Sequence, residues 1–273
     1  MWEKDKSEFE NQVVLVVGGG GGIGSAIAEA FAERKAKVII CSRNVKRLEE
    51  IAKKIREKTN NPMVEAMEVD VTSEDSIKQL AERIASKYGK VDVLVNAHGA
   101  LITALSRRPF LETTIEDWEY MMNINARGVW LTCREFAKIM VKNNKGKIIN
   151  ISSQAGSKVL RGALDNAGFC YAVSKATVDQ ITRAFAIQLV DYNINVNAIA
   201  PGWVETEELL KRGPEAIEMR KRLIPKGRLC KPEEVAELTV FLASSAADYI
   251  TGQVIYIDGG VSAIYGSIQR QQT

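Results

Sequence analysis

The stretch VVLVVGGGGGIGSAIAEAF, residues 13–31, decides the fold. Five consecutive apolar residues, Val13–Val17, predict a strand that is buried on both faces, and a helix is expected to follow the last glycine. The glycines between them allow a tight turn and a close approach of the backbone to a ligand. The positive end of the following helix favours a negative charge, so a phosphate-bearing ligand is expected at this turn.

The glycines satisfy two spacings at once. Gly19, Gly21 and Gly24 fit G-x-G-x-x-G, whereas Gly18, Gly22 and Gly24 fit G-x-x-x-G-x-G. A Walker A loop is excluded, because Ser-Ala follows the last glycine in place of Lys-Ser or Lys-Thr. A flexible turn is the alternative for the spacing alone, but a position between the first strand and the first helix favours a dinucleotide.

Six further apolar runs alternate with helix-like stretches along the chain. Short runs rich in Val and Ile are typical of strands covered on both faces, and their alternation with helices implies right-handed βαβ units. We therefore expect one α/β domain over residues 1–273, a three-layer Rossmann-type doubly wound sheet of about seven parallel strands with helices on both faces. The expected strands are Val13–Val17, Lys37–Cys41, Met63–Val69, Val91–Val95, Lys147–Ile151, Ile194–Ala200 and Gln253–Asp258.

Local signals place several boundaries. Residues 1–12 are expected to form a solvated N-terminal tail. An amphipathic helix is expected over Val45–Lys58, and the capping-box spacing from Thr72 to Asp75 predicts the start of another that ends near Gly89. Residues 203–230 are charged and helical in pattern and follow a strand end, where ligands bind in open α/β sheets. They are interpreted as a mobile substrate lid, with a plain surface helix as the alternative.

Composition excludes several classes of protein. The chain has 273 residues, 46% of them hydrophobic and 26% charged, with a net charge of +3, which indicates a soluble globular protein without an electrostatic footprint for nucleic acid or membrane. A single histidine and four scattered cysteines argue against a zinc site, so no metal is expected. No apolar run approaches the ~18–20 residues of a membrane span. A cytoplasmic location is expected.

The end of the second expected strand bears on cofactor choice. An acidic residue there would bind the adenosine ribose hydroxyls of NAD. The chain instead has Ser42 and Arg43, and a guanidinium suits a 2′-phosphate. NADP(H) is therefore predicted, with NAD(H) as the less favoured cofactor and a merely solvated Arg43 as the alternative interpretation.

A phenol and an ammonium occur four residues apart, at Tyr171 and Lys175, and so on one face of a helix. Free tyrosine titrates near ~10, too high for efficient proton exchange at neutral pH. A nearby ammonium and a cationic nicotinamide would lower that pKa. The spacing alone is common on surfaces, so its significance depends on the residues that accompany it.

Further motifs accompany this pair along the chain. In order, the motifs are the glycine turn, Asp70-Val71, Asn96–Gly99, Asn125, Ser153, Tyr171 with Lys175, Pro201-Gly202 and Asp258-Gly259-Gly260. With these motifs in this order, the chain resembles the short-chain dehydrogenase/reductase family over essentially its whole length. That family has a sheet of seven parallel strands and usually forms homotetramers, so a homotetramer is expected. Its substrates are small molecules that carry a carbonyl or an alcohol.

The resemblance implies a role for each catalytic residue. Tyr171 would exchange the proton with the substrate oxygen, and Ser153 would polarise that oxygen. Lys175 would hold the nicotinamide ribose and tune the phenol, while Asn125 would support a water that relays protons. Hydride would pass between the nicotinamide C4 and the substrate carbon. The implied cofactor-binding residues are Gly18, Gly20, Gly21, Gly22, Ile23, Gly24, Ser42, Arg43, Asp70, Val71, Asn96, Ala97, His98, Gly99, Tyr171, Lys175, Pro201, Gly202, Val204 and Thr206.

The chain departs from the family pattern in three places. Val17 replaces the usual threonine before the glycines, and His98 stands in the usual Asn-Asn-Ala-Gly motif, as a packing or hydrogen-bonding substitution or as a catalytic group. The interval from Ser153 to Tyr171 is long, and the excess, residues 157–169, is expected to shape the substrate pocket. Ser152 is the alternative polarising serine.

Two substrate classes remain open. A sugar, polyol or sugar acid is favoured, because Arg161, Asp165 and Asn166 of the inserted loop could bind hydroxyls and such an insertion is atypical of carrier-protein reductases. The alternative is a 3-oxoacyl-thioester reductase whose acidic acyl-carrier partner could meet the cations of one helix, Arg127, Arg134 and Lys138. A non-catalytic dinucleotide sensor is the alternative from another class, although it would need none of the four catalytic residues.

Overall fold

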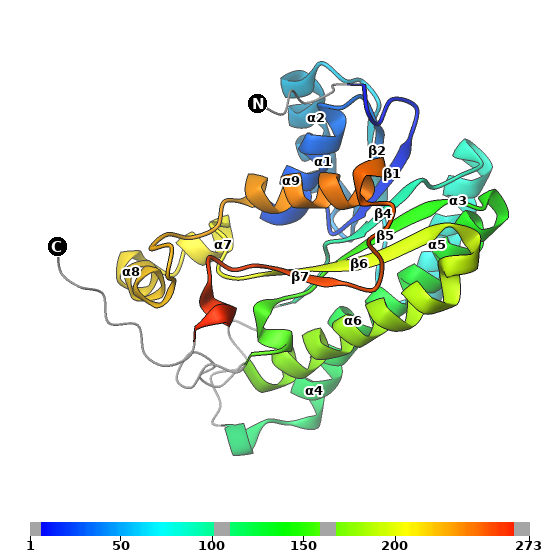
Figure 1. Cartoon of the computed structure of the whole chain (residues 1–273). Coiled ribbons are helices and arrows are strands. Elements are labelled where there is room, and N and C mark those ends of the chain that lie inside the picture. The colour runs from blue at the N-terminus through cyan, green and yellow to red at the C-terminus, as the bar shows by residue number, and fades with distance from the viewer. Residues whose placement is uncertain (1–6, 101–109, 159–167, 265–273) are drawn as a thin grey trace.

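A parallel sheet forms the centre of the computed structural model, which describes residues 7–100, 110–158 and 168–264 (Figure 1). The seven strands are all parallel and lie in the order β3-β2-β1-β4-β5-β6-β7, so the expected Rossmann-type sheet is confirmed. Six of the expected strands differ from the observed ones by one or two residues at an end. The bounds are β1 Val13–Val17, β2 Lys37–Ser42, β3 Val64–Glu68, β4 Val93–Asn96, β5 Gly146–Ile151, β6 Ile194–Pro201 and β7 Val254–Ile257.

Helices cover both faces of this sheet (Figure 1). On one face lie α1 (Gly22–Ala32), α2 (Val45–Thr59) and α9 (Pro232–Ala243), and on the other lie α3 (Glu74–Tyr88), α5 (Gly128–Asn143) and α6 (Gly168–Leu189). The three short helices are α4 (Ile115–Met121), α7 (Glu207–Leu210) and α8 (Pro214–Leu223). The three expected layers are therefore present.

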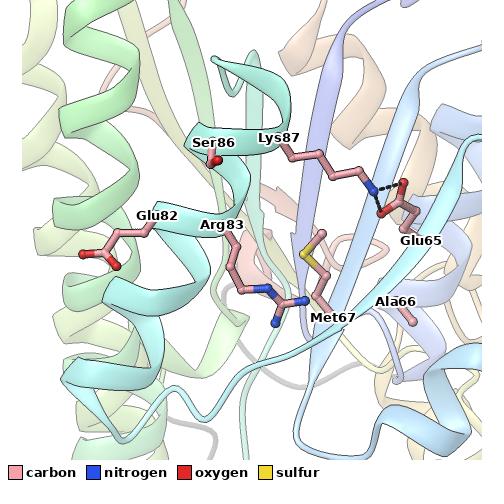
Figure 2. Close-up of a pocket in the computed structure, with 7 residues that line it drawn as sticks. All are labelled: Glu65, Ala66, Met67, Glu82, Arg83, Ser86 and Lys87. Atoms are coloured by element: carbon pink, nitrogen blue, oxygen red, sulfur yellow. Dashed lines mark hydrogen bonds and ion pairs between the residues drawn. The ribbon is translucent and has the colours of Figure 1, made fainter.

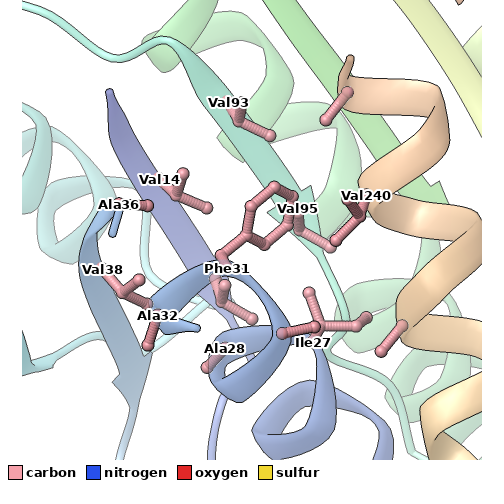
Figure 3. Close-up of a cluster of buried hydrophobic side chains, with 14 of the residues drawn as sticks. Val14, Ile27, Ala28, Phe31, Ala32, Ala36, Val38, Val93, Val95 and Val240 are labelled. Atoms are coloured by element: carbon pink, nitrogen blue, oxygen red, sulfur yellow. The ribbon is translucent and has the colours of Figure 1, made fainter. Parts of the chain in front are cut away.

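Each face of the sheet has its own apolar core. In one of them Phe31 of α1 packs among Val14, Val95 and Val240, which come from two strands and α9 (Figure 3). Phe9 is also fully buried there, and its ring meets that of Phe31 edge to face with centroids 5.0 Å apart. The tail expected over residues 1–12 is therefore too long, because the chain is already anchored at Phe9.

One helix start differs from its prediction for a local reason. Ser73, rather than Thr72, caps α3 by accepting from the Ser76 backbone N–H, because the Thr72 hydroxyl donates to Asp70 instead. Asn125 lies inside a π-helical turn, Met122–Arg127, that joins α4 to α5. Such turns widen a helix by one residue and are frequent at functional sites.

The strand order creates a crevice at one edge of the sheet. The chain leaves β1 toward β2 on one side, whereas β4 pairs with β1 on the other side. Open α/β sheets bind ligands at this switch point, outside the carboxyl ends of the strands. Val17 and Asn96 are in register there, so the glycine turn after β1 and residues 97–99 after β4 lie side by side.

Candidate active site and cofactor cleft

The glycine turn is packed so closely that only glycine fits at two positions. Gly18 has φ +90°, and a Cβ there would lie 2.4 Å from the backbone nitrogen of His98. A Cβ on Gly24 would lie 2.2 Å from the Gly18 carbonyl oxygen. The first turn of α1 is thereby pressed against the end of β1.

The start of α1 is open to an anion. Gly21 is its N-cap and supplies no side-chain cap, and the first turn holds no acidic residue. Gly20, Gly21 and Gly22 have surface exposed to solvent. Uncapped N–H groups at the positive end of a helix suit a pyrophosphate. Across the cleft, the Thr206 side chain lies 3.1 Å from where a Cβ of Gly22 would be, so the predicted phosphate contact at Thr206 faces the turn.

A cavity of about 590 Å³ lies beyond the end of β2. Arg43 and Lys46 line it together with Asn44, Val45 and Glu68. Arg43 is exposed, and its positive charge contributes to holding the pKa of Asp70 below its usual range, after the two hydrogen bonds that Asp70 accepts from Thr72. The predicted adenosine-binding residues are thus gathered at one end of the crevice.

A second cavity, of about 510 Å³, lies between β3 and α3 (Figure 2). The Lys87 ammonium spans it to the Glu65 carboxylate at 2.6 Å. None of the predicted site residues lines it; the lining residues are Glu65, Ala66, Met67, Glu82, Arg83, Ser86 and Lys87.

Tyr171 and Lys175 lie on the same face of α6, as predicted. The Lys175 ammonium lies 5.9 Å from the centre of the Tyr171 ring and donates a hydrogen bond of 2.8 Å to the Ile151 carbonyl. Lys175 is buried, whereas Tyr171 is partly exposed. The helix therefore joins the phenol at the cleft surface to an ammonium fixed on the last residue of β5.

The pKa of Tyr171 differs from the expectation. Burial raises it, and a hydrogen bond with Ser153 lowers it, while Lys175 makes no resolved contribution. The pKa of Lys175 is itself lowered by burial to about 8, although the nearby Asp179 carboxylate raises it. In this structure the Lys175 ammonium donates to the Ile151 carbonyl, and the pKa of Tyr171 is set by burial and by Ser153.

The two adjacent serines face opposite ways. Ser153 is partly exposed, and its hydroxyl is close enough to Tyr171 to lower the pKa of the phenol. Ser152 is buried, and its hydroxyl donates to the Asp179 carboxylate. Successive residues in an extended chain point to opposite sides, so only one of the pair can reach the phenol. The alternative that Ser152 meets the substrate therefore has no geometric support.

The Asn125 side chain is held by hydrogen bonds with Ser174 and Ala100. Its Nδ2 donates to the Ser174 hydroxyl at 2.9 Å and to the Ala100 carbonyl at 3.2 Å, and its Oδ1 accepts from the Ala100 N–H at 2.8 Å. A Cβ on Gly99 would lie 3.2 Å from that Oδ1 and 3.3 Å from the Lys175 Nζ. Asn125 and Lys175 thus converge on Gly99, where any side chain would press on both.

Asn96 is predicted to contact the cofactor, but its side chain is buried and bonds to other buried side chains. Its Nδ2 donates to Asn150 Oδ1 at 2.8 Å, and its Oδ1 accepts from the Thr132 hydroxyl at 2.8 Å. Asn150 in turn donates to the Thr182 hydroxyl at 2.9 Å, and all four residues are fully buried. The sequence analysis did not predict this network. Its sequence signal is that Asn96 and Asn150 stand at the ends of two apolar runs, and the two residues are in register in the sheet.

His98 lies between the two ends of the crevice and is buried, with 8% of its surface exposed. Neither ring nitrogen has a hydrogen-bond partner among the described residues. Nε2 lies 3.1 Å from where a Cβ of Gly128 would be. Burial, reinforced by the charge of Lys175, lowers the pKa of His98 to about 3. The imidazole is therefore neutral near pH 7, as a packing substitution requires.

The segment after β6 closes the other wall of the crevice. The Gly202 N–H donates to Ile257 of β7, and Val204 is buried and forms a parallel bridge with Cys230. That bridge joins the two ends of the segment expected as a lid, residues 203–230, which contains α7 and α8. Most of the inserted loop, including Arg161, Asp165 and Asn166, lies outside the described residues.

The described residues form neither a metal site nor a membrane span. No three His, Cys, Asp or Glu side chains gather there in an arrangement that could hold a metal ion. No helix among the same residues has the length and apolar character of a membrane span.

Known proteins resemble the chain throughout. The sequence profile of the family described as enoyl-(acyl carrier protein) reductase matches residues 18–262. A 3-oxoacyl-[acyl-carrier-protein] reductase, FabG, of Thermotoga maritima is 38% identical over 93% of this chain and 98% of its own. An NAD-dependent glycerol dehydrogenase of Listeria innocua is 35% identical over 92% of this chain and 93% of its own.

A solved structure is also similar to this chain over most of its length. The gluconate 5-dehydrogenase of Burkholderia cenocepacia, in complex with NADP and tartrate, is 26% identical, with a TM-score of 0.85 over 96% of this chain and 99% of that one. The protein is an NAD(P)-dependent oxidoreductase that acts on CH–OH groups. With a parallel seven-stranded sheet, a glycine turn at its switch point and the profile match over most of its length, the chain belongs to the short-chain dehydrogenase/reductase family.

Proposed function

We propose that this protein is an NADP(H)-preferring oxidoreductase that interconverts a secondary alcohol and a ketone in a sugar, polyol or sugar acid. The observation that carries the proposal is the placement of Ser153 beside Tyr171, where its hydroxyl lowers the pKa of the phenol, with the Lys175 ammonium one helical turn away on the same face of α6. This group lies at the same crevice as the open start of α1.

Each residue has a role that its surroundings permit. Tyr171 exchanges a proton with the substrate oxygen through its partly exposed phenol, and Ser153 donates a hydrogen bond to the same oxygen. Lys175 holds the nicotinamide ribose and carries positive charge near the phenol. Asn125 supports a water that relays protons toward Lys175, since both side chains meet at Gly99.

The cofactor residues fit a dinucleotide. Its nicotinamide supplies the hydride-transfer chemistry when bound. The glycine turn, from Gly18 to Gly24, leaves room for the pyrophosphate, and Thr206 faces it. Asp70 and Val71 flank the adenine, residues 97–99 line the cleft after β4, and Pro201, Gly202 and Val204 form its wall near the nicotinamide.

The preference for NADP(H) rests on charge at the end of β2. Ser42 stands there in place of an acid, and the adjoining cavity is lined by Arg43 and Lys46. Arg43 makes no hydrogen bond or ion pair with the described residues, so its guanidinium is free for a 2′-phosphate. Glu68 at the same cavity opposes this charge in part. NADP is bound by one structural relative, whereas another relative is named NAD-dependent.

The substrate class rests on weaker support. The gluconate and glycerol dehydrogenases among the relatives favour a polyhydroxylated substrate. The match to FabG favours the alternative, a 3-oxoacyl-thioester on a carrier protein. The cations suggested for carrier docking are already engaged, because Arg134 pairs with Glu74 and Glu135, and Lys138 pairs with Glu135. This engagement weakens the case for an acidic partner on that helix.

One panel of substrates distinguishes the two classes. Sugars, sugar acids, diketones and acetoacetyl thioesters are offered with NADPH and with NADH, and the absorbance of the reduced cofactor is followed in both directions. We expect the highest kcat/KM with a polyhydroxylated substrate and with NADP(H). A preference for acetoacetyl thioesters would establish the alternative, and equal or NADH-favouring efficiency would contradict the cofactor proposal.

Three further features are also proposed: a homotetramer, a substrate lid and a cytoplasmic location. The homotetramer is proposed on the family resemblance and is tested by light scattering of the purified protein. Residues 203–230 are proposed as a substrate lid because the Val204–Cys230 bridge joins the ends of a segment that carries two short helices. A cytoplasmic location is tested by fractionation of cells that express the protein.

A further inference from the structure

Asp179 is a buried acid one helical turn beyond Lys175 on α6, and it has no part in the roles proposed above. Only 4% of its surface is exposed. Its Oδ1 accepts a hydrogen bond from the Ser152 hydroxyl, which also lies 3.3 Å from the Lys175 carbonyl oxygen. A buried carboxylate is costly unless it is hydrogen-bonded or faces a positive charge, so this position needs a physical explanation.

The chain between β5 and the inserted loop is fastened to α6 on both sides of Ser153. Before it, Ile151 accepts from the Lys175 ammonium, and Ser152 donates to Asp179. After it, a Cβ on Gly156 would lie 2.9 Å from the Lys175 carbonyl carbon and 3.1 Å from Asp179 Oδ2. Asp179 is therefore a partner in the contacts that set where Ser153 stands relative to α6.

Among the described residues, few charged groups act on Asp179 and Lys175. Burial raises the pKa of Asp179, and the Ser152 hydrogen bond followed by the charges of Arg183 and Lys175 lowers it. Arg183 is exposed, so water screens it, whereas Lys175 is buried. Among the described residues, the other titratable groups that face Lys175 are Tyr171 on the same helix and His98 after β4.

We propose that Asp179 is a positioning residue of the reaction. Its carboxylate holds Ser152 and thereby keeps Ser153 in register with Tyr171, and its negative charge keeps Lys175 in the ammonium form. The first part acts through geometry and the second through electrostatics. Both rest on the roles proposed above for Ser153 and Lys175.

Two variants separate the two parts. Asp179→Asn keeps an acceptor for Ser152 but removes the charge, and Ser152→Ala removes the hydrogen bond but keeps the charge. Asp191→Asn is the matched control, because Asp191 is an exposed acid just beyond the end of α6. The measurements are kcat and kcat/KM for ketone reduction from pH 6 to pH 10, the Kd for NADPH by fluorescence across the same range, and the melting temperature.

Asp179→Asn removes the charge that raises the pKa of Lys175, so that pKa falls further below about 8. We expect the alkaline limb of the kcat/KM profile, and the pH at which NADPH binding weakens, to move down by about half to one pH unit. For Ser152→Ala we expect kcat to fall about tenfold with the limb unmoved, because a displacement of Ser153 costs rate rather than charge. Asp191→Asn should match the wild type.

The result that overturns the proposal is a limb for Asp179→Asn that coincides with that of Asp191→Asn. If Asp179→Asn does not fold, an unchanged kcat for Ser152→Ala has the same consequence. Neither result is confused with a failure of the proposed function, in which the wild type itself would show no activity or would be matched by Tyr171→Phe.

Discussion

The two ends of the cofactor crevice are built differently. At the end proposed as catalytic, which is called the catalytic end below, Lys175 and Asn125 are buried and each has fixed partners. At the adenosine end, Arg43 and Lys46 are exposed and line an open cavity. His98 lies between the two, buried yet without a hydrogen-bond partner among the described residues.

This contrast separates chemistry from recognition. A reacting group must be held within a fraction of an ångström, which requires buried neighbours that leave it no alternative position. A phosphate contact at the surface tolerates movement, because a long flexible side chain can follow its ligand. Substitutions should therefore have large effects at the catalytic end and graded effects at the adenosine end.

The largest effect is expected at Tyr171. Tyr171→Phe keeps the ring but removes the hydroxyl that exchanges the proton, and general acid–base catalysis contributes roughly 10²–10⁴-fold. We expect kcat to fall by about 10³-fold while the Kd for NADPH stays within a factor of about three. Steady-state kinetics and fluorescence titration measure the two quantities, and a fully active Phe variant would refute the assignment.

The next effect concerns pH and stability at His98. The folded state lowers its pKa from 6.5 to about 3, so below pH 6.5 the unfolded chain takes up a proton that the folded chain does not. The folded state therefore loses almost no stability through His98 above pH 6.5, and the loss grows as the pH falls toward 3. Between pH 7 and pH 4 we expect the free energy of unfolding to fall by about 3 kcal/mol more in the wild type than in His98→Asn.

Urea unfolding at a series of pH values tests this expectation. His98 is the only histidine of the chain, so the difference between the two proteins reports this one imidazole. Parallel pH dependences would show that His98 can take up a proton in the folded state.

A smaller effect is expected at Gly99. In Gly99→Ala the new methyl group would stand 3.2 Å from Asn125 Oδ1 and 3.3 Å from Lys175 Nζ, so both must give way by a few tenths of an ångström. We expect kcat to fall about tenfold because Lys175 is displaced, with a change in melting temperature of only a few degrees. Wild-type kcat in this variant would mean that Lys175 moves without consequence.

The contrast also explains how much could be predicted from the sequence. The strands were recognisable because both faces of a parallel sheet are covered, which leaves uninterrupted runs such as Val13–Val17. Tyr171 and Lys175 could be paired because a spacing of four places them on one face of any helix. These features depend on local periodicity alone.

The remaining features depend on packing between distant segments. The π-helical turn at Asn125 arises where α4 and α5 join, and nothing in the local sequence marks it. The raised pKa of Tyr171 follows from burial, which the spacing of residues does not reveal. Asp179 reads as an ordinary polar residue in a helix until β5 is placed against it and Ser152 becomes its partner.

The smallest effect is expected at Arg43, where the adenosine end meets solvent. Arg43→Ala removes one charge-assisted contact to a 2′-phosphate, which is worth roughly 1 kcal/mol at an exposed site, so the Kd for NADPH should rise about fivefold. The Kd for NADH, which lacks that phosphate, should change by less than about twofold. Arg47→Ala is the matched control, because Arg47 lies in the first turn of α2 just after Arg43, does not line the cavity and pairs with Glu207 at 3.9 Å. Equal losses for both cofactors would mean that Arg43 supports the fold of the β2–α2 turn rather than reading the phosphate. A loss confined to NADPH that fades with added salt would show that recognition here is electrostatic, unlike the fixed hydrogen bonds at the catalytic end.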